Sequence, residues 1–181
     1  MFDPTIREQH ARARPGATRS PEASTRPAKF QGVSEAQALS FLLKFNQQER
    51  IARFGAAVSD CSIRSWRTNI DRSHYFGVCL TRSREIAGLV ELFGSASTGW
   101  RRPELALSLR HATDSPSLRL QLVEIGLVAA GGQSAIDVLM ALNPGDTDMH
   151  AIVQQCAGTF DRDTGIALIP CGFASGPLPR L

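Results

Sequence analysis

Cysteine and histidine are the side chains that most often bind metals or act as nucleophiles, and this chain has four of each. Cys61, Cys79, Cys156 and Cys171 lie 18, 77 and 15 residues apart, with no CxxC pair and no histidine beside them at zinc-ligand spacing. We therefore expect no metal site and four buried, reduced thiols. His150 lies on the same expected helix as Cys156, and a solvated histidine beside a buried cysteine is the ordinary structural reading of that pair.

Sequence motifs that would indicate nucleotide binding or hydrolysis do not occur. The chain has no GxGxxG or GxxxxGK[ST] loop and no HExxH pair, and residues 172–176 (GFASG) do not match GxSxG. We expect Trp66 and Trp100 to pack against the domain rather than to stack on bases. The remaining candidates for acid–base chemistry are carboxylates, and their meaning depends on the elements that carry them.

The composition indicates one folded domain with a charged N-terminal segment. Of the 181 residues, 43% are hydrophobic, which is enough for a core. The first 29 residues hold six basic and three acidic side chains, so they account for the whole net charge of +3. A dedicated nucleic-acid surface is therefore not expected. No apolar run is long enough to span a membrane and the charged N-terminus is unlike a secretory signal, so we expect a cytoplasmic protein without membrane contacts.

Three regions are distinguished along the chain: an arm at 1–32, a domain at 33–172 and a tail at 173–181. The arm contains four prolines, scattered arginines and no apolar periodicity before Phe30, which is typical of a disordered or extended segment. It can be a solvated tail or a segment that docks on a protein partner. The sequence leaves the oligomeric state open, with a homodimer as one alternative.

Apolar periodicity predicts an α/β domain. Ser34 and Gln37 have the form of a capping box before a helix, whereas residues 46–55 look like a polar connection. We expect helices at 34–44, 59–69, 117–130 and 146–157, and strands at 74–80, 85–93, 104–110, 135–142 and 164–169. This order predicts a mixed sheet with helices on both faces.

Four segments in this order resemble the GNAT superfamily of N-acetyltransferases, in particular a bacterial branch. The resemblance covers about residues 34–170. It rests on 49–55 (ERIARFG) before Val58-Ser59-Asp60, on 86–92 (IAGLVEL), on 104–109 (ELALSL), and on 139–143 (LMALN) with Met149 and Gly158 downstream.

The resemblance implies a GNAT-like fold in which acetyl-CoA lies between the splayed fourth and fifth strands. A carboxylate of the middle strands would then take a proton from the acceptor amine, and Glu91 and Glu104 occupy such positions. The residues implied along the cofactor are Leu109, Arg110, Ser117, Leu118, Arg119 and Asn143. Glu104–Leu109 and Ala135–Leu142 should be neighbouring parallel strands that diverge at their C-terminal ends.

The segment that corresponds to the pyrophosphate loop departs from the family pattern. Residues 111–119 (HATDSPSLR) contain no glycine, Pro116 has no N–H, and Asp114 adds negative charge where glycines and free amides would approach an anion. The expected helix after the fifth strand also has no tyrosine to protonate a leaving thiolate. The sequence thus favours a GNAT-like protein with degraded catalytic and cofactor motifs, serving as a regulatory or interaction module. An N-acetyltransferase with an atypical cofactor loop is the alternative.

Overall fold

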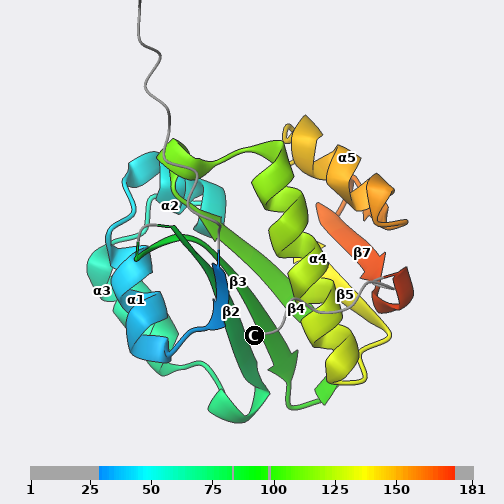
Figure 1. Cartoon of the computed structure of the whole chain (residues 1–181), viewed down its shortest axis with the longest axis horizontal. Helices are drawn as coiled ribbons and strands as arrows, with labels where there is room; N and C mark the ends of the chain where they lie inside the picture. Colours follow the sequence, from blue (N-terminus) through cyan, green and yellow to red (C-terminus); the bar gives the residue numbers. More distant parts are fainter. Residues whose placement is uncertain (1–28, 83, 98, 174–181) are drawn as a thin grey trace, which may run out of the picture.

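The sheet at the centre of the molecule is mixed, as the sequence predicts (Figure 1). The computed structural model describes residues 29–82, 84–97 and 99–173. In this part of the chain the strands follow the order β1-β2-β3-β4-β5-β7-β6. The strands are β1 Lys29–Gly32, β2 Tyr75–Arg82, β3 Glu85–Ser95, β4 Gly99–Leu109, β5 Asp137–Ala141, β6 Thr159–Asp161 and β7 Ile166–Pro170. The helices are α1 Glu35–Leu43, α2 Gln47–Phe54, α3 Asp60–Thr68, α4 Pro116–Gly132 and α5 Thr147–Gln155.

The expected parallel contact between β4 and β5 is confirmed. Strands β1 to β4 are antiparallel, whereas β4 and β5 run parallel and pair at Glu104 and Leu139. The Ile136 amide also donates to the Arg101 carbonyl at 3.1 Å. Beyond Glu104 and Leu139 both strands border a cavity rather than each other. The two strands therefore separate toward their C-terminal ends.

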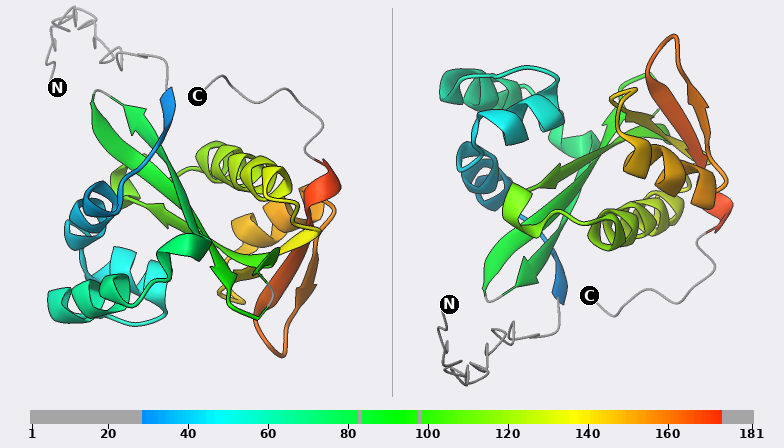
Figure 2. Two further views of the ribbon diagram at one scale, coloured as in Figure 1. Left: turned by 90° about the horizontal axis from the view of Figure 1, so that it is seen from below. Right: turned by 90° about the horizontal axis from the view of Figure 1, so that it is seen from above.

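Helices cover both faces of the sheet (Figure 2). Alternate residues of β2 and β3, such as Leu80 and Val90, pack with α4 and α5 in the larger core. Their neighbours Cys79 and Leu89 pack with α1 and α3 in a second core on the opposite face. Because side chains alternate along a strand, Glu91 points to the same face as Leu89, toward the N-terminal helices.

Helix α2 corrects one prediction, because the expected connection at 46–55 contains a helix, Gln47–Phe54, with Asn46 and Gly55 as its caps. The Asn46 side chain accepts the Glu49 amide, and the Glu49 carboxylate accepts the Asn46 amide in return. Gly55 ends the helix with φ of 73°, a conformation that suits glycine. The two end signals outweigh the polar composition between them.

The predicted boundary of the N-terminal arm also changes. Residues 29–32 form β1, an edge strand in which Phe30 pairs with Leu80. Backbone pairing with β2 orders this segment despite its weak apolar pattern. The expectation of a partner-docking arm falls mainly on residues 1–28, and the tail falls on 174–181, both outside the described residues.

The described helices and the four thiols were also the subject of predictions. No described helix is long and apolar enough to cross a bilayer. Cys79, Cys156 and Cys171 are buried and free, and burial raises the pKa of each thiol. Cys61 contradicts the prediction of four buried thiols, because it is exposed in the first turn of α3.

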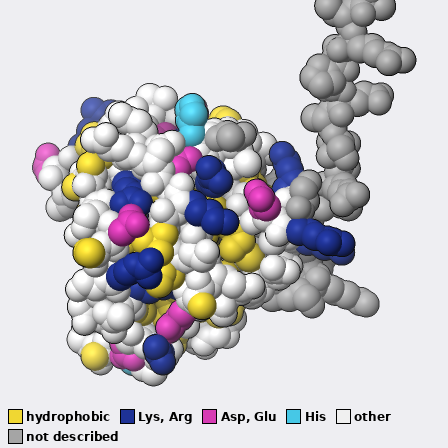
Figure 3. All heavy atoms as spheres, turned by 90° about the vertical axis from the view of Figure 1, so that its left-hand side faces the viewer, with side chains coloured by type: hydrophobic (Ala, Val, Ile, Leu, Met, Phe, Trp, Pro, Cys, Tyr) yellow, Lys and Arg dark blue, Asp and Glu magenta, His cyan; other side chains and the backbone are white. Residues whose placement is uncertain are grey.

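Figure 3 views the face of α1, α2 and α3, where basic side chains are interspersed with acidic ones.

Candidate functional site

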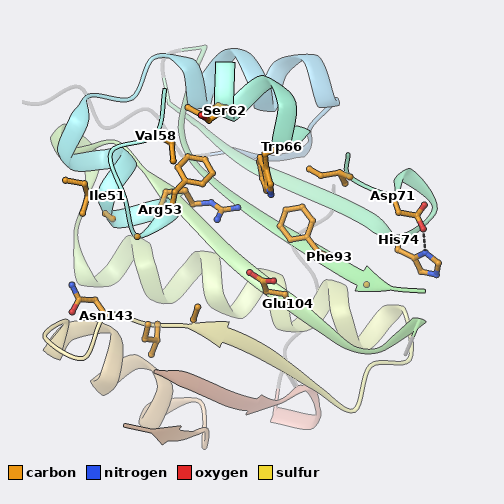
Figure 4. A pocket seen from close by; sticks show the side chains of 18 residues that line it. Ile51, Arg53, Val58, Ser62, Trp66, Asp71, His74, Phe93, Glu104 and Asn143 are labelled. Carbon is orange, nitrogen blue, oxygen red and sulfur yellow. Dashed lines mark hydrogen bonds and ion pairs between the residues drawn. The ribbon is translucent and has the colours of Figure 1, made fainter. Parts of the chain in front are cut away.

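Two cavities meet where β4 and β5 separate. The wide cavity, about 980 Å³, lies between α2, α3, the ends of β3 and β5 and the middle of β4 (Figure 4). The narrow cavity, about 220 Å³, lies between the separating halves of β4 and β5. Both cavities share the lining residues Ala52, Arg53, Glu104, Ala141, Leu142 and Asn143, and we call this shared region the junction.

One wall of the wide cavity is aromatic. The ring centroids of Phe54 and Trp66 are 5.5 Å apart, and those of Trp66 and Phe93 are 5.7 Å apart, in edge-to-face contacts. These rings come from α2, α3 and β3, and Figure 4 shows Trp66 and Phe93 facing the cavity. The wall can hold the apolar body of a ligand.

Glu104 lies at the junction, where β4 makes its pairing with β5. Its side chain is exposed and forms no ion pair or hydrogen bond with any described residue. A carboxylate in this position can accept a proton or bind a cationic group. Its catalytic role, expected from the sequence, stays a prediction.

Glu91 occupies a different environment, at the centre of a buried cluster that we call the Glu91 cluster: Glu91, Arg67, Arg53 and Tyr75. The Glu91 side chain is 0% exposed. One oxygen pairs with Arg67 and accepts the Tyr75 hydroxyl at 3.0 Å, and the other lies 3.3 Å from Nη2 of Arg53. Both oxygens are therefore occupied, and Glu91 lines neither cavity.

Contacts among the members of this cluster stabilise their charge states. Burial opposes the charge of Arg67, but the Glu91 carboxylate and the Tyr75 hydroxyl together raise its pKa. Burial raises the pKa of Tyr75, and the nearby Glu91 carboxylate raises it further. Tyr75 thus stays neutral, while Glu91 anchors the two arginines.

Gly77 makes room for this arrangement. It pairs with Glu91 on the neighbouring strand. A Cβ atom at Gly77 would lie 2.5 Å from the Tyr75 hydroxyl oxygen, closer than nonbonded atoms approach. The absence of a side chain lets Tyr75 reach back over its own strand to Glu91.

Arg53 connects the cluster to the cavities. Its Nε donates to the Ser108 hydroxyl at 2.9 Å, and its guanidinium carbon lies 5.1 and 5.3 Å from the Phe54 and Trp66 ring centroids. The side chain is 10% exposed, and Figure 4 shows its guanidinium directed into the middle of the wide cavity. Sequence analysis did not single out Arg53 or Arg67, because arginines on short polar helices look solvated.

Of the residues expected along a cofactor, Leu109, Arg119 and Asn143 line the narrow cavity, and Arg110, Ser117 and Leu118 do not. Leu109 lines this cavity, and Arg110 lies 4.0 Å from Glu49. Leu118 donates its amide to the Ser115 hydroxyl at 3.3 Å, so Ser115 caps α4. Ser117 is exposed in the first helical turn. Asn143 lines both cavities, and its Oδ1 accepts the Gly145 amide at 2.9 Å.

Around the start of α4, carboxylates accept the hydrogen bonds of the neighbouring polar groups. Arg119 donates to Asp114 through Nε at 2.6 Å and to Asp146 through Nη1 at 2.8 Å. The His111 amide donates to the Glu49 carboxylate at 2.7 Å. We call Glu49, Asp114 and Asp146 the loop carboxylates. Sequence analysis noted the charge of Asp114 but not the convergence of all three, which requires the fold.

An acid–histidine pair closes the opposite end of the wide cavity. Nδ1 of His74 lies 2.8 Å from Asp71, and Ser73 donates its amide and hydroxyl to the same carboxylate. The bond to His74, followed by those to Ser73, lowers the pKa of Asp71 to about 2. The wide cavity thus has an ionised carboxylate at this end and Glu104 at the junction.

Comparisons with known proteins identify the fold. No family model matches the sequence, and no curated protein matches it. Many solved structures resemble the chain, among them the following three. The GNAT domain of S. lividans PAT is 16% identical (TM-score 0.59, 78% of this chain and 88% of that one). An N-acetyltransferase from Staphylococcus aureus Mu50 is 11% identical (TM-score 0.61, 79% of this chain and 95% of that one). Aminoglycoside acetyltransferase AAC(6')-Ib in complex with coenzyme A is 10% identical (TM-score 0.62, 80% of this chain and 95% of that one). The chain has the fold of the GNAT acetyltransferases.

Proposed function

We propose that this chain is a ligand-binding module on a GNAT fold, with a regulatory role and without acetyl-CoA-dependent catalysis. The observation that carries the proposal is the convergence of Glu49, Asp114 and Asp146 around the start of α4. Function has to be argued from such features, because one fold serves many activities.

Acetyl-CoA, which the fold implies, fits the chain only in part. The narrow cavity between β4 and β5 suits an extended, uncharged arm such as pantetheine. A pyrophosphate needs free amides and unpaired cations at the following helix. Here Pro116 has no N–H, Ser115 accepts the Leu118 amide, and Arg119 is shared by two carboxylates. We derive no reaction step through this cofactor.

The described residues around the cavities also lack a suitable proton donor on α5. Of this helix, Met149 lines the narrow cavity, together with the N-cap Asp146. Neither a thioether nor a carboxylate bound to arginine can donate a proton to a leaving thiolate. His150 is directed elsewhere, with its ring 4.2 Å from Phe160.

A second candidate is an acyl-CoA-dependent N-acetyltransferase with an atypical loop. The observation that favours it is the junction, where the unpaired carboxylate of Glu104 borders both cavities. A base placed between a donor cleft and an acceptor cavity could take the proton of an amine.

Calorimetric titration with coenzyme A, acetyl-CoA and pantetheine separates the two candidates. We expect no measurable heat with either CoA form at millimolar concentration, and any weak binding should be confined to pantetheine. Micromolar binding of acetyl-CoA would overturn the proposal and favour the acetyltransferase. Circular dichroism before and after the titration confirms that the protein remains folded.

A further inference from the structure

The Glu91 cluster carries more positive than negative charge. Arg53 and Arg67 contribute two cations, Glu91 contributes one anion, and the Tyr75 hydroxyl is neutral. The side chains of Arg53, Arg67 and Glu91 are 10%, 4% and 0% exposed. A buried charge without a partner is costly, so the excess cation favours an anion from outside the cluster.

Within the cluster, Arg53 is the residue that can meet such an anion. Arg67 and Tyr75 line neither cavity, whereas Arg53 lines both. Its Nε bonds Ser108 and its Nη2 bonds Glu91, but Nη1 has no partner among the described residues. The described side-chain atoms that are fully buried without a partner are Nε of Arg67 and Nε2 of His150. Nη1 of Arg53 is not one of them, so it is accessible from the cavity.

The orientation of this guanidinium is fixed in advance. Ser108 and Glu91 hold two of its nitrogens, and the ring centroids of Phe54 and Trp66 lie 5.1 and 5.3 Å from its guanidinium carbon. A preorganised donor loses little entropy when it binds an oxyanion. Glu104 borders the same junction but forms no ion pair with Arg53 among the described contacts.

We propose that the wide cavity selects a ligand with one carboxylate, which binds Nη1 of Arg53, and an aromatic or apolar body, which packs on Phe54, Trp66 and Phe93. This rests on the proposed function, which makes the wide cavity a ligand site. A carboxylate is favoured over a phosphate because the Glu104 carboxylate lines the same cavity and would repel a second negative charge, whereas Asp71 is paired with His74. Glu104 can in addition bind an ammonium group, as in an amino acid.

Four small probes with the same phenyl ring test the proposal: 3-phenylpropionate, L-phenylalanine, phenethylamine and neutral 3-phenylpropanamide. Binding is followed by calorimetry and by the fluorescence of Trp66, with a Trp100→Phe variant to remove the second indole. We expect 3-phenylpropionate to bind at least about tenfold more tightly than 3-phenylpropanamide, because a charge-assisted hydrogen bond replaces a neutral one. L-Phenylalanine should share this preference, and Glu104→Gln should weaken the binding of L-phenylalanine relative to that of 3-phenylpropionate.

Arg53→Met should remove the preference for the carboxylate over the amide. This variant is expected to fold, because Arg67 still pairs with Glu91 and methionine retains an apolar stem. Arg53→Lys should retain part of the preference. Arg72→Met is the matched control, because Arg72 is 81% exposed and lies outside the cavity lining.

The proposal is overturned if wild-type protein binds the carboxylate no better than the amide, if no probe binds at millimolar concentration, or if Arg53→Met retains the preference. Failure of the proposed function has a separate signature. Micromolar binding of acetyl-CoA would refute the non-catalytic role while leaving the Arg53-dependent carboxylate preference intact.

Discussion

Arg119 and Asp146 join α4 to α5 across the far end of the narrow cavity, with Nη1 of Arg119 2.8 Å from both carboxylate oxygens. Asp114 binds the other side of the same guanidinium. The hydrogen bonds that Arg119 donates to Asp114 and the charges of both carboxylates raise the pKa of Arg119. The cation at the start of α4 is therefore neutralised from within the chain.

Neutralising the two aspartates should admit an anion. In the double variant Asp114→Asn, Asp146→Asn, we expect coenzyme A, which should give no measurable heat with wild type, to bind measurably, with an affinity raised by about tenfold or more, because Arg119 is released and two like charges are removed. Asparagine is a good N-cap, so α5 should still form. Titration calorimetry of the variant against wild type measures the change.

Two controls make this result specific. Asp148→Asn removes one charge from the exposed side of α5 and should leave the affinity unchanged. Pantetheine, which carries no pyrophosphate, should bind the double variant and wild type alike. An equal affinity of the double variant and wild type for coenzyme A would show that these carboxylates do not exclude it.

Glu91 should be important for stability. Glu91→Ala leaves Arg67 buried without its carboxylate, and we expect the free energy of unfolding to fall by about 3–5 kcal/mol. Urea denaturation followed by circular dichroism measures the loss. Glu85→Ala on the exposed start of the same strand should cost much less, and a loss below about 1 kcal/mol for Glu91→Ala would contradict the buried ion pair.

Tyr75 is the single tyrosine of the chain, so its ionisation can be followed by absorbance in the near ultraviolet. Burial and the Glu91 carboxylate raise its pKa in the folded state. In the unfolded chain the Tyr75 hydroxyl loses its proton at about pH 10, as an ordinary tyrosine does. The protonated Tyr75 hydroxyl therefore contributes fully to the free energy of unfolding below about pH 10, and this contribution is lost as the pH rises above it.

We accordingly expect no tyrosinate signal from the folded protein near pH 10, and a signal at higher pH that appears together with unfolding. Far-ultraviolet circular dichroism on the same samples reports the fold. A tyrosinate transition centred near pH 10 in folded protein would place Tyr75 in solvent.

Gly77→Ala should disturb the same cluster through its shape. The new Cβ would lie 2.5 Å from the Tyr75 hydroxyl oxygen, and overpacking of this kind costs about 1–3 kcal/mol. Gly32→Ala in the edge strand meets no atom within 4 Å and provides the matched control. Equal melting temperatures for the two variants would contradict the close approach.

The fold could be predicted from the sequence where patterns are local and periodic. Ser34 caps a helix as expected, and the strands around Val90 and Leu105 have the apolar pattern of buried sheet. Helix α2 was missed because its apolar residues are few, although Asn46, Glu49 and Gly55 carried its end signals. Strand β6 was missed because three residues cannot show a period.

The site could be predicted only in part. The position of Glu104 follows from the splayed strands, which the sequence indicates. The burial of Glu91 beneath Arg53 and Arg67 depends on how α2 and α3 pack on the sheet, and no local pattern records that. Asp146 caps α5, and its second contact, with Arg119, depends on the spacing of α4 and α5.

The central claim is that the loop carboxylates exclude a pyrophosphate, and phosphorus-31 NMR of coenzyme A observes that group directly. With wild-type protein at millimolar concentration, we expect the two pyrophosphate resonances to keep the shift and width of free coenzyme A. With the double variant Asp114→Asn, Asp146→Asn, they should broaden. Broadening or a shift of these resonances with the wild-type protein would contradict the account.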